Sequence, residues 1–217
     1  MSNSAKIWGV AGLAVVAGIF LIMAVAKGPD AIITGSSVAL AADDWTLGNK
    51  DSGVVLIEYS DFACPACKAA SPAINQLIDE FGEHMVFVYR HFPLNIPGHQ
   101  NAPLAARAAE AAGLQGKFFE MTDKLFMYQE VWKPAGDPQA NFEQYATDIG
   151  LDLEKFKADY DSSATKSAVD DDLASSNDLR LNSTPTFFLN GEKISNPRTY
   201  DDFRNIIRNA IENAKNS

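Results

Sequence analysis

Two short runs of branched apolar residues predict buried strands in the first half of the chain. Val54 to Ile57 is one continuous apolar run, and Met85 to Tyr89 is a second. Runs of this kind are typical of strands buried on both faces, in a sheet with parallel neighbours. Between them, apolar residues recur at helical spacing from Ala70 to Phe81, and Gly82 suits the end of that helix. The order strand, helix, strand predicts a right-handed crossover.

The pattern then changes to helices alone. Between about residue 98 and residue 181, apolar positions follow the helical period. This stretch therefore predicts an all-helical insertion within an α/β domain. Its expected helices cover Ala102 to Ala112, Lys117 to Tyr128, Phe142 to Ile149, Leu153 to Tyr160 and Ser163 to Leu181.

Strand character returns near the C-terminus. Thr186 to Leu189 predicts a third strand, and Asn190-Gly191 suits the two-residue turn of a hairpin that Glu192 to Ser195 completes. Thr199 is the expected N-cap of a last helix. That helix has one apolar face, made by Phe203, Ile206, Ile207, Ala210 and Ile211.

The N-terminal residues differ in character from the rest of the chain. Residues 7–26 contain no charge and have about the length that crosses a bilayer core as a helix. Two interpretations of residues 1–27 stay open: a membrane anchor, or a signal segment cleaved near Ala24-Val25-Ala26. The stretch is longer than a usual signal core, which favours the anchor. Residues 28–44, rich in Gly, Ala and Ser, predict a flexible linker before a folded domain at 45–217.

Composition and charge exclude two classes of protein. The 217 residues are 47% apolar and 10% aromatic, which is enough for one domain with a core and excludes a disordered chain. Residues 28–217 carry 16 basic against 28 acidic side chains. Such an acidic surface is a poor partner for nucleic acid, whose phosphates require basic side chains.

The candidate chemistry lies in the only two cysteines of the chain. Cys64 and Cys67 enclose Pro65 and Ala66 at the place where a buried strand gives way to a helix. The thiolate is the species that attacks a disulfide, and the N-terminus of a helix favours that anion. We therefore expect Cys64 to ionise first and Cys67, one turn further on and more buried, to be the resolving thiol. Pro65 fits because the first helical residue needs no N–H partner.

Three other interpretations of the cysteine pair stay open. A structural disulfide over four residues would restrict the unfolded chain little. A zinc site needs four ligands, and the pair lacks a second close pair of ligands. Two inert buried cysteines are the third alternative. We expect His84, His91 and His99 to be ordinary surface or strand-end residues, and we predict neither a metal nor a bound cofactor.

Two further residues are candidates for the site. Pro185 precedes the third predicted strand. A cis bond there would expose backbone for pairing with an extended substrate, whereas a trans proline would only begin the strand. Glu58 lies six residues before Cys64. If buried, it would have a raised pKa and could exchange protons with Cys67; on the surface it would have no role.

Together these residues resemble the DsbA-like branch of the thioredoxin superfamily, including its membrane-tethered bacterial members. The resemblance covers about Trp45 to Ala214 and keeps the family's order of motifs. These motifs are Cys64-Pro65-Ala66-Cys67 after the strand VVLIEYSDF, Tyr89-Arg90-His91-Phe92-Pro93-Leu94, Ala105-Ala106-Arg107-Ala108-Ala109-Glu110, and Thr184-Pro185-Thr186-Phe187-Phe188.

The resemblance implies a fold and a set of roles. The fold is thioredoxin-like with an inserted all-helical domain at about 98–181, preceded by one N-terminal transmembrane helix. Cys64 is then the nucleophile, Cys67 the resolving cysteine, Pro185 the cis-proline and Glu58 the acid near the buried thiol. The substrate is expected to contact Pro65, Ala66 and Thr184. The Pro-Ala dipeptide lacks the histidine of strongly oxidising members, and Thr precedes Pro185, so the direction of electron flow stays open.

The function that we predict is extracytoplasmic thiol-disulfide exchange. The Cys64-Cys67 disulfide would be donated to reduced or misoxidised proteins in the periplasm or on the outer cell surface. By the resemblance, a membrane quinone-linked oxidase of DsbB or vitamin K epoxide reductase type would reoxidise the pair. The protein would be anchored through residues 7–26, or secreted if this segment is cleaved. A disulfide reductase or isomerase, and a non-catalytic peptide-binding or chaperone module, are the alternatives.

Overall fold

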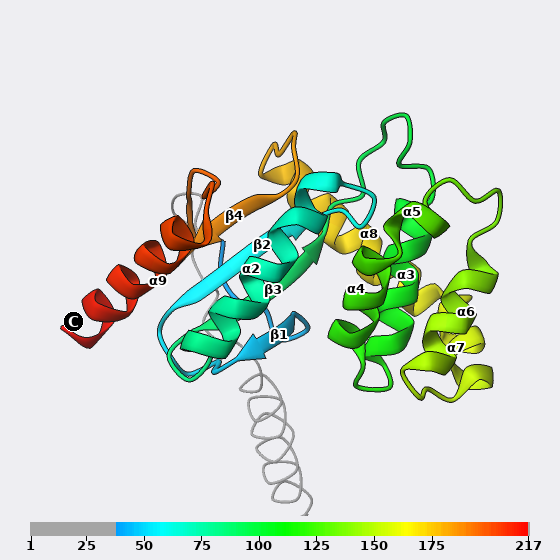
Figure 1. Cartoon of the computed structure of the whole chain (residues 1–217), viewed down its shortest axis with the longest axis horizontal. Coiled ribbons are helices and arrows are strands. Elements are labelled where there is room, and N and C mark those ends of the chain that lie inside the picture. Colours follow the sequence, from blue (N-terminus) through cyan, green and yellow to red (C-terminus); the bar gives the residue numbers. More distant parts are fainter. Residues whose placement is uncertain (1–37, 217) are drawn as a thin grey trace, which may run out of the picture. The chain divides into compact units, whose positions relative to one another are not determined.

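The computed structural model describes residues 38–216, and it contains one mixed sheet of five strands in the order β1-β3-β2-β4-β5 (Figure 1). β2 and β3 are parallel, as the predicted crossover requires, whereas β1 runs antiparallel to β3 and β4 antiparallel to β2. The strands are β1 (Trp45–Gly48), β2 (Val55–Ser60), β3 (Val86–His91), β4 (Thr186–Leu189) and β5 (Glu192–Lys193).

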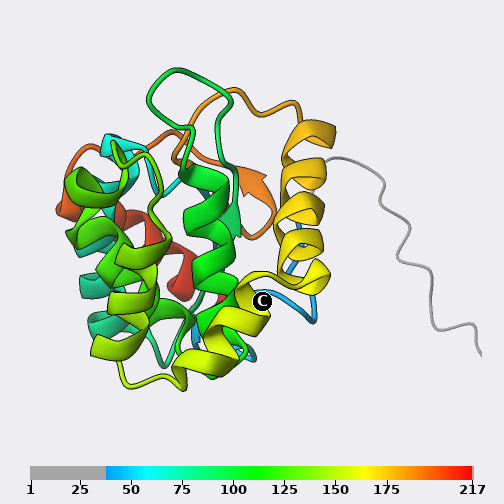
Figure 2. The ribbon, with the colours of Figure 1, turned by 90° about the vertical axis from the view of Figure 1, so that its right-hand side faces the viewer.

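The helices divide into two groups. α2 (Pro65–Phe81) and α9 (Tyr200–Lys215) belong to the sheet domain, and the remaining described helices form a group beside it (Figures 1 and 2). This arrangement confirms the predicted α/β fold with an all-helical insertion. The inserted helices are α3 (Ala102–Gly113), α4 (Phe118–Met127), α5 (Gln129–Trp132), α6 (Gln139–Asp148), α7 (Leu153–Tyr160) and α8 (Ser163–Asp178).

Both faces of the sheet are buried, which explains the continuous apolar runs in the sequence. Successive side chains of a strand point to opposite faces. Leu56 and Phe87 accordingly belong to one core with residues of α2 and α9, such as Leu77 and Ile207. The neighbouring residues Ile57, Val88 and Phe188 belong to a second core on the other face, with Val38 and Leu181.

The predicted linker extends too far along the chain, because residues 38–44 pack onto the sheet domain. Val38 is buried, and its N–H donates to the carbonyl of Gly191 over 3.2 Å. Arg90 also binds this segment. Its Nε lies 2.8 Å from Oδ1 of Asp44, and its Nη2 lies 2.8 Å from the carbonyl oxygen of Ala39. A buried arginine needs such partners. The small residues of this segment are therefore part of the fold.

Local signals set most boundaries. Asn190 and Gly191 have φ of 49° and 85°, as the predicted two-residue hairpin turn requires. Thr199 and Asp202 form a capping box at the start of α9, which confirms Thr199 as its N-cap. α8 ends at Asp178, before the predicted Leu181, because Arg180 adopts a left-handed φ of 53° that stops the helix. No local pattern predicted β1 or α5.

The predicted transmembrane segment, residues 7–26, lies outside the described residues. None of the helices between residues 38 and 216 combines the length and the apolar character that crossing a bilayer requires.

Candidate active site

The two cysteines lie at the start of α2. Cys64 is the N-cap residue with an extended backbone (φ −80°, ψ 123°), and Pro65 is the first helical residue. The two sulfurs are not bonded to each other in this structure. Cys64 is 7% exposed and Cys67 1%, whereas Pro65 and Ala66 between them are exposed. The nucleophile candidate is thus the more accessible sulfur, next to two exposed residues that a protein substrate could contact.

The surroundings drive the pKa values of the two thiols apart. A hydrogen bond from the Cys67 thiol, together with those from the Thr184 hydroxyl and the N–H groups of Cys67 and Ala66, lowers the pKa of Cys64 to about 5 against its partial burial. Burial, the bond with Cys64 and the negative charge of Glu58 raise the pKa of Cys67 well above its ordinary value. At neutral pH the pair therefore holds a thiolate at position 64 and a thiol at position 67.

The start of β4 lies against the nucleophile. The Thr184-Pro185 peptide bond is cis, and the Cys64 sulfur lies 3.4 Å from the Thr184 carbonyl oxygen, to which it donates when protonated. The Thr184 hydroxyl is buried and has no other hydrogen-bond partner in the described part of the chain, so it is available to the Cys64 thiolate. The fold thus brings together two motifs that are 120 residues apart.

Glu58 is a buried carboxyl on the strand that leads to the cysteines. It is 4% exposed and accepts a hydrogen bond of 2.7 Å from the Ser60 hydroxyl. Burial raises the pKa of Glu58 to about 7. Glu58 also lines a cavity of about 700 Å³ between the sheet, α2 and α4. Glu58 therefore titrates near neutral pH, where a general acid or base for the nearby Cys67 is most effective.

A second carboxylate, which no sequence pattern singled out, orders the loop before Cys64. Asp61 Oδ1 accepts from the N–H of Ala63 over 2.7 Å, and its carbonyl oxygen accepts from the N–H of Cys64 over 2.9 Å. Asp61 Oδ2 accepts from the N–H of Leu94 and lies 2.7 Å from Nδ1 of His99. The position of Asp61 in the run VVLIEYSDF was the only available signal.

The prediction for the histidines was wrong at His99, which is buried outside any strand. His84 is exposed and His91 ends β3, as expected, although His91 is buried. Nε2 of His91 lies 2.9 Å from Oε1 of Glu110, and His99 pairs with Asp61. Both imidazoles are therefore engaged with carboxylates. Their partners come from distant parts of the chain, which sequence spacing does not reveal.

Comparison with known proteins identifies the family. The sequence pattern of the thioredoxin family matches residues 41–209, which is most of the chain. The chain belongs to the thioredoxin family. The Cys64-Pro65-Ala66-Cys67 motif and the cis bond before Pro185 both lie inside the matched range.

Solved structures show which thioredoxin-like fold this is. Oxidised BdbD from Bacillus subtilis is 23% identical with a TM-score of 0.67, and the match covers 77% of this chain and 92% of BdbD. The α-DsbA1 protein of Wolbachia pipientis is 19% identical with a TM-score of 0.70, over 81% of this chain and 94% of that protein. At these identities the likeness concerns the fold, which is the DsbA-like thioredoxin fold.

Curated relatives are more similar in sequence but much longer. A protein named Na(+)/H(+) antiporter NhaA 1, from Mycobacterium sp. strain KMS, is 41% identical over 158 residues, which are 71% of this chain and 24% of that protein. The chain thus spans about a quarter of the length of the curated relatives it matches. The antiporter name belongs to those whole proteins and describes nothing seen in this thioredoxin-family domain.

We expect the substitution Glu58→Gln to stabilise the reduced thioredoxin-family domain above neutral pH. Burial raises the pKa of Glu58 from its ordinary 4.5 to about 7. The wild-type protein therefore keeps its full stability below about pH 4.5, and its unfolding free energy falls as the pH rises from there through about 7. This rise in pKa corresponds to about 3 kcal/mol of unfolding free energy. Urea unfolding should therefore show the variant gaining about that much over the wild type between about pH 4.5 and pH 8. A constant difference across this range would contradict the burial argument.

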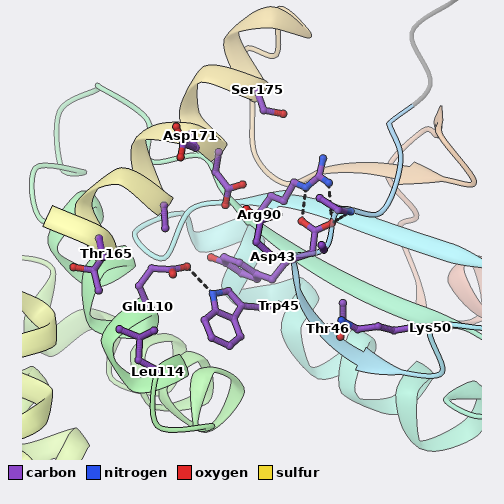
Figure 3. Close-up of a pocket in the computed structure, with 17 residues that line it drawn as sticks. Asp43, Trp45, Thr46, Lys50, Arg90, Glu110, Leu114, Thr165, Asp171 and Ser175 are labelled. Atoms are coloured by element: carbon purple, nitrogen blue, oxygen red, sulfur yellow. Dashed lines mark hydrogen bonds and ion pairs between the residues drawn. The ribbon is translucent and has the colours of Figure 1, made fainter. Parts of the chain in front are cut away.

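A second cavity lies away from the redox site. It has a volume of about 880 Å³, lies between the edge of the sheet and helices α3 and α8, and is lined by neither cysteine. Figure 3 shows Trp45 from β1 and Glu110 from α3 pointing toward each other there, with Nε1 donating to Oε1 over 2.7 Å. The Trp45 ring also lies so close to Gly113 that a side chain at this glycine would collide with it. These contacts fasten the insertion to the sheet.

Proposed function

We propose that this protein is an extracytoplasmic thiol-disulfide oxidoreductase that donates the Cys64-Cys67 disulfide to reduced proteins. The observation that carries the proposal is the position of Cys64 as the N-cap of α2, 3.4 Å from the carbonyl before the cis bond of Pro185, where its surroundings lower its pKa to about 5. Whatever stabilises the thiolate stabilises the reduced pair relative to the disulfide. The disulfide is then the form that is consumed, and the protein acts as an oxidant.

The reaction uses the asymmetry between the two sulfurs. A substrate thiolate attacks Cys64 of the disulfide, the bond between the cysteines breaks, and Cys67 leaves with the electron pair. Since the pKa of Cys67 is high, this sulfur takes up a proton, which we assign to the Glu58 carboxyl. A second substrate thiolate then attacks the substrate sulfur of the mixed disulfide. Cys64 departs as a stable thiolate, so the substrate gains a disulfide and the protein gains two electrons.

The exposed surroundings of Cys64 support a protein substrate. Pro65 and Ala66 are exposed beside the sulfur, and the Thr184 carbonyl lies 3.4 Å from it. An extended segment that places its cysteine at Cys64 would pass along the backbone at Thr184 and Pro185, as peptides add to the edge of a sheet. Contacts through backbone suit an enzyme that accepts many unfolded sequences.

The cellular setting is also part of the proposal. Disulfides form and persist outside the cytoplasm, and the twenty uncharged residues from Ile7 to Ala26 suit a membrane anchor or an export signal. A donor that leaves each cycle reduced needs an oxidant. We assign this role to a membrane quinone-linked thiol oxidase, in keeping with the DsbA-like fold.

The equilibrium of the purified protein with glutathione tests the direction of electron flow. We expect a reduction potential less negative than about −200 mV, so that reduced glutathione readily consumes the disulfide. Measurement requires only the ratio of oxidised to reduced protein over a series of glutathione buffers. A potential more negative than about −250 mV would make the protein a reductase and contradict disulfide donation.

A further inference from the structure

Gln129 connects the helical insertion to the backbone of the nucleophile. It lies on the short helix α5 and is 0% exposed. Its Nε2 donates to the carbonyl oxygen of Phe62 over 2.6 Å and to that of Cys64 over 3.1 Å. The side-chain amide of Gln129 therefore donates two hydrogen bonds to carbonyls within residues 62–64, the three residues that end at the nucleophile.

The amide completes the hydrogen bonding of the loop before α2. Asp61 accepts the N–H groups of Ala63 and Cys64, over 2.7 and 2.9 Å. Gln129 donates to the Phe62 carbonyl, and also to the Cys64 carbonyl, which accepts a second hydrogen bond from the N–H of Lys68 over 3.1 Å. Asp61 thus accepts hydrogen bonds from N–H groups of the loop, and the insertion, through Gln129, donates hydrogen bonds to carbonyls of the loop. These contacts help to fix the conformation of the N-cap residue Cys64.

Other contacts already hold α5 in place. Trp132 is fully buried and donates from Nε1 to the carbonyl of Leu125 over 2.7 Å, and Asn101 donates to the Trp132 carbonyl over 3.2 Å. Oε1 of Gln129, by contrast, is buried and finds no hydrogen-bond partner among residues 38–216. A buried acceptor without a hydrogen-bond partner is energetically unfavourable. The two hydrogen bonds that the same amide donates to the loop explain why Gln129 is nevertheless buried here.

We propose that Gln129 is a positioning residue through which the insertion holds the Phe62 and Cys64 carbonyls, and so keeps the Cys64 sulfur at the opening turn of α2. The proposal deepens the function above and rests on Cys64 being the nucleophile. Its chemical consequence is direct. The N–H groups of Ala66 and Cys67 stabilise the thiolate only while the N-cap keeps its extended conformation. Without the amide, the Phe62 carbonyl loses this hydrogen bond and the Cys64 carbonyl keeps only the one from the N–H of Lys68, so the loop is held less firmly.

The substitution Gln129→Met tests this role, since methionine has a similar length and donates no hydrogen bond. The matched control is Gln144→Met on α6, where an exposed amide donates to Asp148 over 2.8 Å. The rate at which the reduced protein reacts with a small neutral disulfide is measured against pH. We expect the midpoint for Gln129→Met to rise by about one pH unit. Near pH 5 this slows the reaction about twofold, because the roughly fivefold lower ionisation is partly offset by the greater nucleophilicity of a thiolate with a higher pKa. Gln144→Met should match the wild type.

Two outcomes would overturn the proposal. A wild-type midpoint in Gln129→Met excludes a positioning role, even if urea unfolding shows lower stability. If Gln129→Met does not fold, Gln129→Asn keeps the amide and shortens its reach; a wild-type midpoint there has the same meaning. Failure of the proposed function looks different, because the wild-type protein itself would then lack a thiol that reacts at low pH.

Discussion

Replacing Cys64 with serine reduces the catalysed oxidation of a reduced test protein to the uncatalysed background. Serine offers no group that can form the mixed disulfide, and the remaining sulfur of Cys67 is 1% exposed with a raised pKa. Cys67→Ser has the opposite consequence. The lone Cys64 thiolate can still attack a disulfide of an oxidised test protein: the substrate disulfide breaks, one of its sulfurs joins Cys64 and the other leaves as a thiolate. Without Cys67, no second thiol of the protein can release this adduct, so mixed disulfides accumulate.

Two incubations measure these results. Recovery of activity by the reduced test protein is followed with each protein in its oxidised form. Each reduced variant is also incubated with an oxidised test protein, and adducts are separated on a non-reducing gel. The double variant Cys64→Ser/Cys67→Ser is the control, and it should form no adduct. Unchanged recovery of activity with both single variants would contradict the assignment of the redox site to Cys64 and Cys67.

The reactivity of Cys64 is expected to cross that of free cysteine as the pH changes. With a pKa of about 5, Cys64 is almost fully ionised at about pH 6, where free cysteine with a pKa of about 8.5 is almost fully protonated. A thiolate of lower pKa is, however, the weaker nucleophile. Together these effects make Cys64 about tenfold faster than free cysteine with a neutral disulfide at about pH 6, and about thirtyfold slower at about pH 10.

This crossing separates a stabilised thiolate from a merely accessible thiol. An exposed cysteine with an ordinary pKa would follow free cysteine at every pH. Stopped-flow measurement on the reduced protein gives the profile, and Cys64→Ser shows which part of the signal belongs to position 64. A constant ratio of the two rates across the pH range would contradict the stabilised thiolate.

Local sequence signals predicted the parts of the site that lie on one element. The change from the apolar strand to a helix at Cys64, with Pro65 as its first residue, correctly predicted a cysteine pair at a helix N-terminus. Strand and helix periods likewise predicted the α/β fold and its insertion. These predictions worked because hydrophobic periodicity and helix starts depend on neighbouring residues.

Contacts between distant residues could not be predicted in this way. Gln129 meets Cys64 across 65 positions, and His99 meets Asp61 across 38. Burial of Glu58 depends on α2 and α4 covering its strand, which the alternation of the strand itself does not show. Residues 38–44 looked like a linker because their packing depends on Arg90, which lies far along the chain. Each miss is a tertiary contact that overrides a local pattern.

The stabilised thiolate at Cys64 is the basis of the proposed chemistry, and a pH titration of the reduced protein tests it directly. Thiolate formation is followed by ultraviolet absorbance in the wild type and in Cys64→Ser. We predict a transition with a midpoint near 5 in the wild type and its loss in the variant. A single transition near pH 8.5, the value of an ordinary cysteine, would contradict a stabilised thiolate at this position.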